Sequence, residues 1–379
     1  MRIFYCLIVL ILTLTQSACA FQLKEISSIS VKALKQMIGG KVVDLKMARV
    51  AEENGRIFLL VRDEKSRILE WYLIDPLKKN VIDKGKCPFT AFNLYALSPD
   101  GKTVLALSRY PTALWSLDTV SRQWNKLYQN TTVSGEQFVI SNTTPVAIVS
   151  STKAYSVLDK VDDKQCITDT CIVSFNPCDF HFEIIISSRD LRKKAFEMAM
   201  PIIGKMKALK DCSANTMDSH INYIRYGDDN SLCFNLRIVS LKNKKNLQDL
   251  LYYFKPPSAL ECIDTADGYV QPLYVSTKKD CIIYKKTTQN SLTEVYALEK
   301  GKKEKIIDLS ALVAGCIDND TIGIAALKKK ALEIHIYRKG EKPQKVEAFA
   351  NSYKVCFLRE GGIIIFVSKD RIKCFRIMS

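Results

Sequence analysis

The chain has 379 residues, of which 47% are hydrophobic and 25% are charged, a composition typical of a globular protein with a large core. An intrinsically disordered chain is therefore excluded. Lys and Arg number 56 against 40 Asp and Glu, so the net charge of +16 brings anionic partners into consideration: nucleic acid, an acidic glycan or an anionic lipid surface.

Residues 1–20 have the three-part pattern of a secretory signal. Arg2 precedes an apolar run over residues 3–14, and the small residues Ala18-Cys19-Ala20 follow. The apolar run is shorter than the roughly 20 residues that a transmembrane helix needs. We expect cleavage after Ala20, which leaves residues 21–379 as one domain in a secreted or periplasmic compartment.

Two alternatives for this segment stay open. Ser17-Ala18-Cys19 resembles the end of a lipobox, which would attach a lipid to Cys19, although Gln16 stands where Leu is usual. An uncleaved segment would instead anchor the chain. Membrane association is expected only in these two cases, because no second apolar run of spanning length follows.

The residues after the signal predict one strand and one short helix. Residues 22–30 contain apolar Leu23, Ile26 and Ile29 among polar side chains, and we predict that they form a strand outside the repeated units. Ser30 can cap a helix over residues 31–38, and Gly39-Gly40 can end it.

A repeated unit organises the rest of the chain. In each copy an apolar run ends in Asp or a substitute, passes through a short basic turn and enters a more polar run, as a β-hairpin does. Eight runs fit, the last with no turn after it: residues 71–75, 114–118, 155–159, 183–188, 237–241, 295–299, 334–338 and 372–376. Further apolar runs precede most copies, at residues 57–61, 104–107, 281–284 and 322–327.

The spacing of these copies predicts the fold. It averages 43 residues from Asp75 to Arg376, which matches the roughly 40 to 45 residues of a four-stranded β-propeller blade. One interval is only 29 residues, from Asp159 to Ser188, so one copy could be half a blade. We predict an all-β fold, a single β-propeller of seven blades with eight as the alternative. Residues 22–30 would pair with the last run and close the ring without an unpaired edge.

One segment carries a family resemblance. Ser98, Pro99, Asp100 and Gly101 follow one apolar run and precede a second at residues 103–107 and a third at 114–118. Pro99 sets the first turn dihedral, Asp100 favours the next position and Gly101 tolerates a positive φ. Residues 94–118 resemble the WD-like repeat of TolB-type and other β-propellers. The resemblance implies a fold and no functional subfamily.

Eleven of the 13 cysteines lie after residue 20. Export permits disulfides, and the odd count leaves at least one thiol outside an intramolecular pair. The candidate local disulfides join Cys166 to Cys171 or Cys178, and Cys356 to Cys374. Cysteines within apolar strands are instead interpreted as small buried hydrophobes.

No catalytic residue, cofactor site or metal site is predicted. The three histidines, His181, His220 and His335, belong to no known catalytic motif in this sequence. A zinc site made by the three neighbouring cysteines and His181 lacks the tight pairs of zinc modules. Acidic turns at residues 228–230 and 318–320 offer oxygens for Ca²⁺, but neither completes an EF-hand loop.

This lack of a recognisable site favours an interaction scaffold that binds a protein or a glycan and is not an enzyme. One alternative is an exported hydrolase or lyase with its site in the central channel, and another is a basic surface that binds an anionic polymer or a membrane. Nucleic acid is not expected, because the chain is exported and its aromatic residues lie within strands. Lysine pairs such as Lys285-Lys286 and Lys302-Lys303 are assigned to exposed turns.

Overall fold

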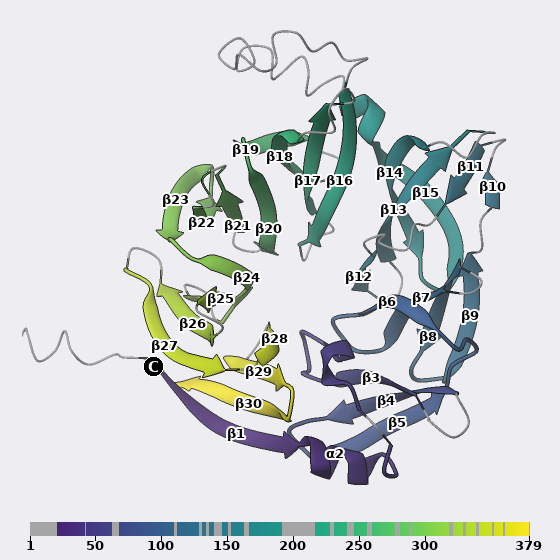
Figure 1. Ribbon diagram of the computed structural model, residues 1–379, viewed down its shortest axis with the longest axis vertical. Helices are drawn as coiled ribbons and strands as arrows, with labels where there is room; N and C mark the ends of the chain where they lie inside the picture. Colours follow the sequence, from purple (N-terminus) through teal and green to yellow (C-terminus); the bar gives the residue numbers. More distant parts are fainter. Residues whose placement is uncertain are drawn as a thin grey trace, which may run out of the picture.

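Seven antiparallel sheets are arranged in a ring in the computed structural model, with one strand of each sheet facing the ring axis (Figure 1). The protein is therefore a seven-bladed β-propeller. The described residues are 21–41, 43–62, 68–109, 112–128, 131–133, 136–139, 146–150, 153–162, 167–191, 217–227, 231–240, 246–255, 260–276, 281–288, 290, 292–317, 321–328, 331–338, 341–350, 352–358 and 361–378.

The first three blades follow one another along the chain. Blade 1 contains β2 (Arg49–Val50), β3 (Ile57–Arg62), β4 (Leu69–Asp75) and β5 (Asn80–Lys86). Blade 2 contains β6 (Phe92–Leu97), β7 (Thr103–Arg109), β8 (Thr112–Asp118) and β9 (Gln123–Tyr128). Blade 3 contains β12 (Val146–Ser150), β13 (Lys153–Val161), β14 (Ile167–Asn176) and β15 (Asp179–Ser187). A hairpin of β10 (Thr131–Val133) and β11 (Glu136–Val139) adds to the second half of β13.

The remaining four blades have the same layout. Blade 4 contains β16 (Met217–Tyr226), β17 (Leu232–Ser240), β18 (Asn246–Phe254) and β19 (Glu261–Ala266). Blade 5 contains β20 (Tyr269–Ser276), β21 (Cys281–Thr287), β22 (Thr293–Glu299) and β23 (Lys302–Ile307). Blade 6 contains β24 (Ser310–Cys316), β25 (Thr321–Lys328), β26 (Ala331–Arg338) and β27 (Gln344–Ala350). Blade 7 contains β28 (Ser352–Phe357), β29 (Ile363–Ser368), β30 (Arg371–Met378) and β1 (Gln22–Ser30).

Blade 7 closes the ring with strands from both ends of the described chain. β1 pairs antiparallel with β30, from Gln22 opposite Met378 to Ser30 opposite Arg371, and the two strands lie side by side in Figure 1. The predicted closure is confirmed, and it leaves β30 with a partner on both sides. Helix α2 (Val31–Met37) follows, and the Ser30 side chain accepts a hydrogen bond from the Ala33 backbone N–H as the predicted cap. A short 3-10 helix, η1 (Leu45–Met47), then leads into blade 1.

The predicted hairpins are confirmed in most blades, with two corrections. The copies at residues 155–159 and 183–188 belong to one sheet, because β13, β14 and β15 pair in sequence. The eight-blade alternative is therefore wrong, and the short interval marks half a blade. In addition, β13 continues to Val161, so the turn predicted after Asp159 lies further along the chain.

The hydrophobic core is divided among the seven interfaces between adjacent blades, with one cluster at each interface. Middle strands are packed on both faces and therefore have continuous apolar runs, as in β3, where every residue from Ile57 to Val61 is buried. The cluster between blades 7 and 1 also receives Leu34 of α2. This packing between blades sets the position of each innermost strand relative to the innermost strand of the next blade.

The turn motif is a structural feature of blade 2. Ser98 and Thr103 are joined by a backbone hydrogen bond of 2.8 Å across the turn between β6 and β7, and the Ser98 hydroxyl lies 2.6 Å from Asp100 Oδ1. Gly101 has a φ of +72°, the left-handed conformation that the sequence predicts there. Pro99 contributes its carbonyl oxygen, which accepts a hydrogen bond from the Glu53 backbone N–H of blade 1. The motif thus helps to fasten two blades together.

The candidate disulfides are not formed among the described cysteines. Cys356 and Cys374 flank the same residue, Ile365, on strands either side of β29. Two strand spacings separate them by roughly 10 Å, whereas bonded cysteines have Cα atoms within about 7 Å. Cys171 lies well inside β14 and Cys178 beyond its end, about 16 Å further along an extended strand. Cys166 lies outside the described residues.

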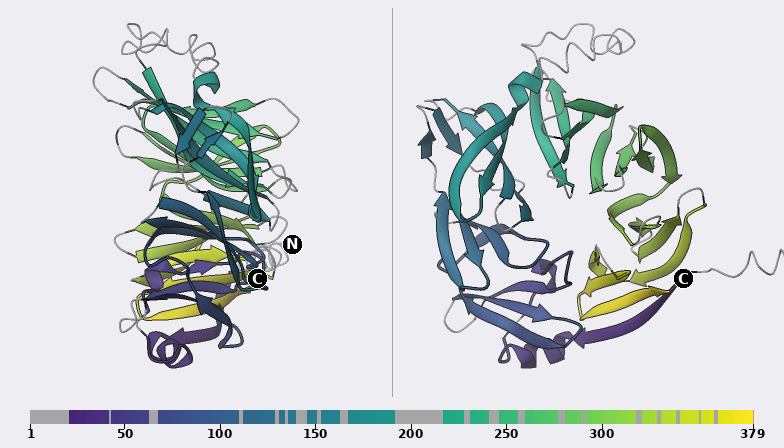
Figure 2. Two further views of the ribbon diagram at one scale, coloured as in Figure 1. Left: turned by 90° about the vertical axis from the view of Figure 1, so that its right-hand side faces the viewer. Right: turned by 180° about the vertical axis from the view of Figure 1, so that it is seen from behind.

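Seen edge-on, the ring is narrower than it is face-on, and α2 lies on its rim (Figure 2). Within the described residues, no helix has both the length and the apolar character needed to span a membrane. Three segments with sequence-based predictions lie outside the described residues. They are the predicted signal peptide, residues 1–20, and the two acidic turns considered for Ca²⁺, residues 228–230 and 318–320.

Candidate functional site

Each blade places one innermost strand at the propeller axis, and most of these strands contact the innermost strand of the next blade. The innermost strands are β2, β6, β12, β16, β20, β24 and β28. Few charged residues lie within their bounds: Arg49, Asp218, His220, Arg225 and Lys354. The acidic residue and the histidine are both on β16. The other charges on these strands are cationic, so the described channel wall is basic and apolar.

A recurring contact links basic side chains to the next blade around the ring. In four places an Arg or Lys donates to a backbone carbonyl at or beside the next innermost strand. The pairs are Arg49 with Tyr95 at 3.0 Å, Arg225 with Leu273 at 3.3 Å, Lys285 with Ala311 at 3.0 Å and Lys354 with Ala48 at 2.6 Å. A backbone carbonyl accepts a hydrogen bond but carries no formal charge, so it does not neutralise the Arg or Lys that donates to it. The positive charge of these side chains therefore stays available to a ligand.

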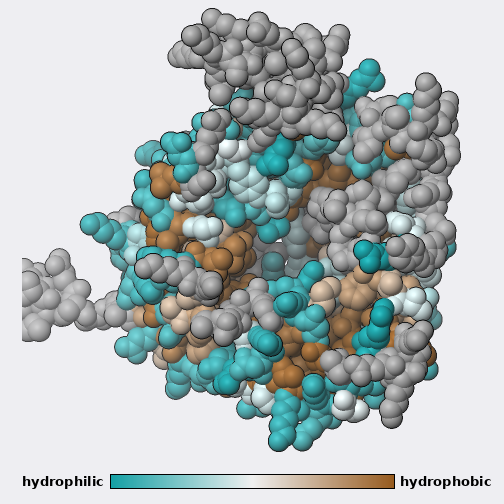
Figure 3. Space-filling model, in the orientation of Figure 1, coloured by the Kyte–Doolittle hydropathy of each residue, from teal (hydrophilic) through white to brown (hydrophobic). Residues whose placement is uncertain are grey.

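A cavity of about 290 Å³ lies beside two of these contacts, between blades 6, 7 and 1, and we call it the channel pocket. Its apolar wall includes Leu312 and Val313 of β24 and Leu332 of β26. Its polar side includes Arg49 of β2, Lys354 of β28 and Glu52, which follows β2. Leu312 is 45% exposed and lines the cavity. Figure 3 shows apolar side chains gathered beside the central hollow of this face. The pocket is close to the lower limit of volumes that hold small ligands.

The electrostatics of the pocket centre on Lys354. Burial and, to a smaller extent, the nearby Arg49 lower the pKa of its ammonium to about 7, while Asp44 opposes the shift. Within the described chain, neither Arg49 nor Lys354 has a carboxylate at salt-bridge distance. Arg49 also lies over the Tyr95 ring, 4.7 Å from its centroid, which fixes the plane of the guanidinium. The pocket therefore holds two positioned cations and the Glu52 carboxylate beside an apolar wall.

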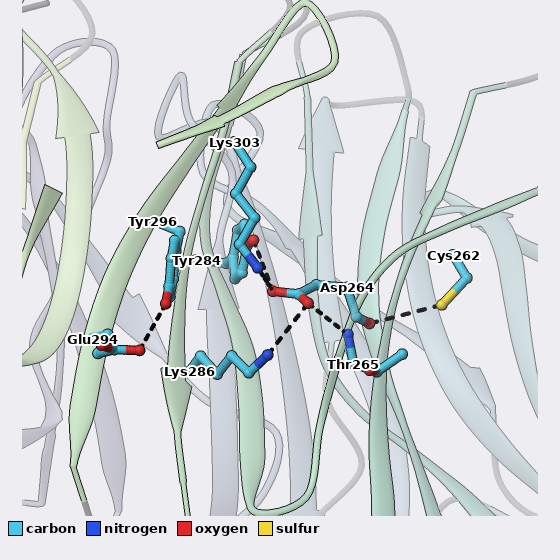
Figure 4. A network of polar contacts seen from close by, with 8 residues as sticks. All are labelled: Cys262, Asp264, Thr265, Tyr284, Lys286, Glu294, Tyr296 and Lys303. Atoms are coloured by element: carbon cyan, nitrogen blue, oxygen red, sulfur yellow. Dashed lines mark hydrogen bonds and ion pairs between the residues drawn. The ribbon is translucent and has the colours of Figure 1, made fainter. Parts of the chain in front are cut away.

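A second polar cluster, between blades 4 and 5, is satisfied by its own members (Figure 4). The carboxylate of Asp264 on β19 accepts hydrogen bonds from the Lys303 ammonium at 2.6 Å, the Tyr284 hydroxyl at 2.8 Å and the Thr265 backbone N–H at 2.8 Å, and Lys286 lies 3.4 Å away. Burial opposes ionisation, but these donors outweigh it and hold the pKa of Asp264 below its usual value. Because its donors and acceptors are matched, we interpret the cluster as a contact that stabilises two blades.

A third cluster is buried within blade 4. Asp249 is fully buried and accepts two hydrogen bonds from Arg237, at 2.9 and 3.1 Å, in a bidentate ion pair. The Val270 backbone N–H of blade 5 also points to this carboxylate, at 3.3 Å. The pair therefore joins the two blades and leaves no vacant ligand position.

The histidines considered as catalytic residues or, for His181, as a zinc ligand are dispersed over three strands. His181 and His220 are exposed on β15 and β16, while His335 is buried on β26 beside Glu333 at 3.1 Å. In the part of the chain that the structure describes, no group of three or more His, Cys, Asp or Glu is arranged to hold a metal ion.

The residues of the channel pocket were missed by the sequence analysis. Lys354 is a single charge in an otherwise apolar and aromatic run, and Arg49 likewise interrupts an apolar stretch; such isolated charges are the signal that could have revealed them. Two predictions about lysine pairs were wrong: Lys285-Lys286 lies within β21, and Lys302-Lys303 begins β23, so neither pair is in a turn. Lys285 is the partly buried member of these pairs that contacts the next blade. Burial within β21 lowers the pKa of its ammonium.

Comparison with known proteins confirms the fold and leaves the function open. No protein-family model matches the chain, and no curated protein matches its sequence. Among solved structures it resembles a prolyl endopeptidase, with a TM-score of 0.54, 12% identity and 88% of this chain covered. The match covers 48% of the prolyl endopeptidase chain, so the present chain spans about half of its length.

Two further structures match over nearly their whole chains. A chain of the mitotic checkpoint complex matches with a TM-score of 0.53 and 9% identity, over 96% of this chain and 98% of its own. An oligogalacturonate lyase in complex with manganese matches with a TM-score of 0.50 and 10% identity, over 94% of this chain and 98% of its own. Identities this low establish the propeller fold alone. The similar structures include enzymes and a chain of the mitotic checkpoint complex, so the fold does not choose between catalysis and binding.

Proposed function

We propose that the protein is an exported β-propeller that binds a protein or glycan partner at the channel pocket and carries out no reaction there. The observation that carries this proposal is the composition of the pocket, where two cations, Arg49 and Lys354, face an apolar wall. Binding sites commonly combine a mostly apolar lining with a few fixed polar groups. The described innermost strands place an acidic residue and a histidine on β16 alone, and Glu52, which follows β2, is the carboxylate among the residues that line the pocket.

Export is part of the proposal and has its own test. Phe21, the first residue after the expected cleavage site, is buried with blades 6 and 7, and the Arg338 guanidinium lies 5.0 Å from the centroid of its ring. A mature chain that begins at Phe21 would therefore keep its first residue packed. Expression of the full sequence in a secreting host, followed by N-terminal sequencing of the released protein, should give Phe-Gln-Leu. Retention of residues 1–20, or a lipid on Cys19, would overturn soluble export.

The partner is tested by capture from the native extracellular or periplasmic extract. Immobilised protein of residues 21–379 is compared with its Lys354→Met variant, at about 50 and 200 mM salt, because binding by counterion release weakens steeply over this range. We expect a defined protein or glycan that the wild-type retains at both salt concentrations and the variant loses. Binding lost at high salt from both chains would instead support the basic-surface alternative.

A propeller enzyme remains the second candidate, and Lys354 is the observation that favours it. With a pKa of about 7, its amine is partly neutral at neutral pH and is therefore more nucleophilic than an ordinary lysine. Incubation of the protein with peptide and oligosaccharide libraries, followed by mass spectrometry, tests this candidate. A turnover product that Lys354→Met fails to form would replace the binding proposal.

A further inference from the structure

We propose that the channel pocket recognises the C-terminal residue of a peptide chain, with the terminal carboxylate on Arg49 and Lys354 and an apolar side chain against Leu312, Val313 and Leu332. This inference rests on the proposed binding function and names the part of the partner that enters the pocket. Its three supports are the unused donors of the two cations, the apolar wall and the size of the cavity.

Both cations keep hydrogen-bond donors beyond those that the protein uses. The Arg49 guanidinium donates to the backbone oxygens of Tyr95, Ala48 and Met47 through Nε and Nη1, which leaves Nη2 without an acceptor among the described residues. The Lys354 ammonium has three donors and gives one to Ala48. A carboxylate offers two oxygens with several lone pairs, so it can accept from both side chains at once.

The opposite wall favours an apolar group next to that carboxylate. Leu312 is 45% exposed, and Val313 and Leu332 complete the same side of the cavity. An acidic sugar or a free phosphate would cover this wall with polar atoms or leave it wet, whereas an aliphatic or aromatic side chain removes it from water. A volume of about 290 Å³ suits one terminal residue better than an extended segment.

The charges around Lys354 make the recognition depend on pH. Arg49 faces it from β2, and Asp44 precedes η1. Glu52 follows β2 and lines the pocket, and Cys356 shares the strand of Lys354. Blades 6 and 7 otherwise contribute apolar residues. A carboxylate favours the charged ammonium, so binding should draw a proton onto Lys354 when the solution is near or above pH 7. Affinity should therefore fall as the pH rises.

Isothermal titration of residues 21–379 with matched probes tests the proposal. The probes are N-acetyl-phenylalanine and Gly-Gly-Phe as free acids, with the corresponding C-terminal amides as controls. We expect each acid to bind at least about tenfold more tightly than its amide at pH 6, and this preference to shrink several-fold by pH 9. At pH 7.5 binding of the acid should also be accompanied by proton uptake at Lys354, which titrations in buffers of different ionisation enthalpy measure.

Variants separate recognition from a structural role. Arg49→Met and Lys354→Met should abolish the preference for the acid, and Lys354→Arg should preserve it. The matched controls are Arg225→Met and Lys285→Met, which cut the equivalent inter-blade hydrogen bonds elsewhere in the ring and should preserve the preference. Leu312→Ser should weaken acid and amide alike. If a methionine variant fails to fold, Lys354→Arg and Leu312→Ser still test the proposal, because the first should keep the preference for the acid and the second should weaken the binding of acid and amide alike.

Several results would overturn the inference. They are equal affinity for acid and amide, no detectable binding of the acids at millimolar concentration, or equal loss in the two control variants. Tighter binding of glucuronate or inorganic phosphate would assign the cations to another ligand class. A partner captured from the extract whose binding is unaffected by C-terminal amidation would preserve the proposed function and reject only this inference.

Discussion

The Lys354 ammonium lies 2.6 Å from the carbonyl oxygen of Ala48, so a half-buried cation fastens the last blade to the start of the first at the propeller axis. Its folded pKa of about 7 lies far below the value of about 10.4 expected in the unfolded chain. Between these values the unfolded chain binds more protons, and the free energy of unfolding therefore rises with pH from about 7 to 10.

The first prediction follows from this linkage. Lys354→Met removes the titrating group, so the variant should lack the gain in stability that the wild-type shows between pH 7 and 9, on the order of 1–2 kcal/mol after solvent screening. Urea unfolding of both chains at pH 6, 7, 8 and 9 measures the difference. Parallel stability curves for the two proteins would contradict the assigned pKa.

The second prediction concerns the contact of blade 7 with blade 6. Gly315 and Gly323 are opposite each other on β24 and β25, and a Cβ atom on Gly323 would lie only 2.2 Å from the Phe357 ring. Gly323→Ala should therefore destabilise the fold by about 1–3 kcal/mol through overpacking. Thermal unfolding measures the loss. The double variant with Phe357→Leu should recover part of it, and a fully additive double variant would show that the ring is not the cause.

The third prediction concerns the buried ion pair of blade 4. Arg237→Met leaves the fully buried Asp249 without its bidentate partner and should cost about 3–5 kcal/mol. Replacing both residues, as Arg237→Met with Asp249→Leu, removes the unpaired charge and should restore much of the stability. A double-mutant cycle in urea measures the coupling. A double variant as unstable as the sum of the single variants would show that the two side chains act independently.

The fourth prediction concerns acid stability at the contact between blades 4 and 5. The donors around Asp264 lower its folded pKa, so its contribution is present above about pH 4 and is lost as the pH falls through the folded value. Asp264→Asn should therefore lower stability at neutral pH and flatten its dependence between pH 4 and 2. Asp308→Asn, at a more exposed ion pair with Lys305, serves as the control and should change stability by less than about 1 kcal/mol. An equal effect of the two variants would refute the role of the buried cluster.

The fifth prediction concerns ring closure. A chain that starts at Val31 lacks β1 and exposes the outer edge of β30, so it should aggregate or lose cooperative unfolding. Size-exclusion chromatography and thermal unfolding compare it with residues 21–379. Addition of a synthetic peptide of residues 21–30 should restore the monomer. A truncated chain that stays monomeric and equally stable would show that closure by β1 is dispensable.

Local features of the sequence predicted much of the fold. The turn at Ser98 to Gly101, the Ser30 cap and the pairing of residues 22–30 with the last run were all predicted from residues close together in the chain or from the need to cover a sheet edge. Turn dihedrals and helix caps depend on a few neighbouring side chains, and the repeat length reflects the strands that one blade needs. For this reason the prediction of a seven-bladed propeller did not require knowledge of the packing.

Tertiary packing decided three features that the local sequence pattern left undetermined: blade membership, cysteine pairing and the position of the channel pocket. The copies at Tyr155 and Glu183 look equivalent in sequence, yet they share blade 3 because strand pairing sets blade membership. Cys356 and Cys374 are only 18 positions apart, but an intervening strand keeps them from bonding. The channel pocket depends on Lys354 meeting Ala48, 306 residues away in the chain. Such contacts arise from register and from closure of the whole ring, so the sequence by itself determined the blades and the tertiary structure decided the site.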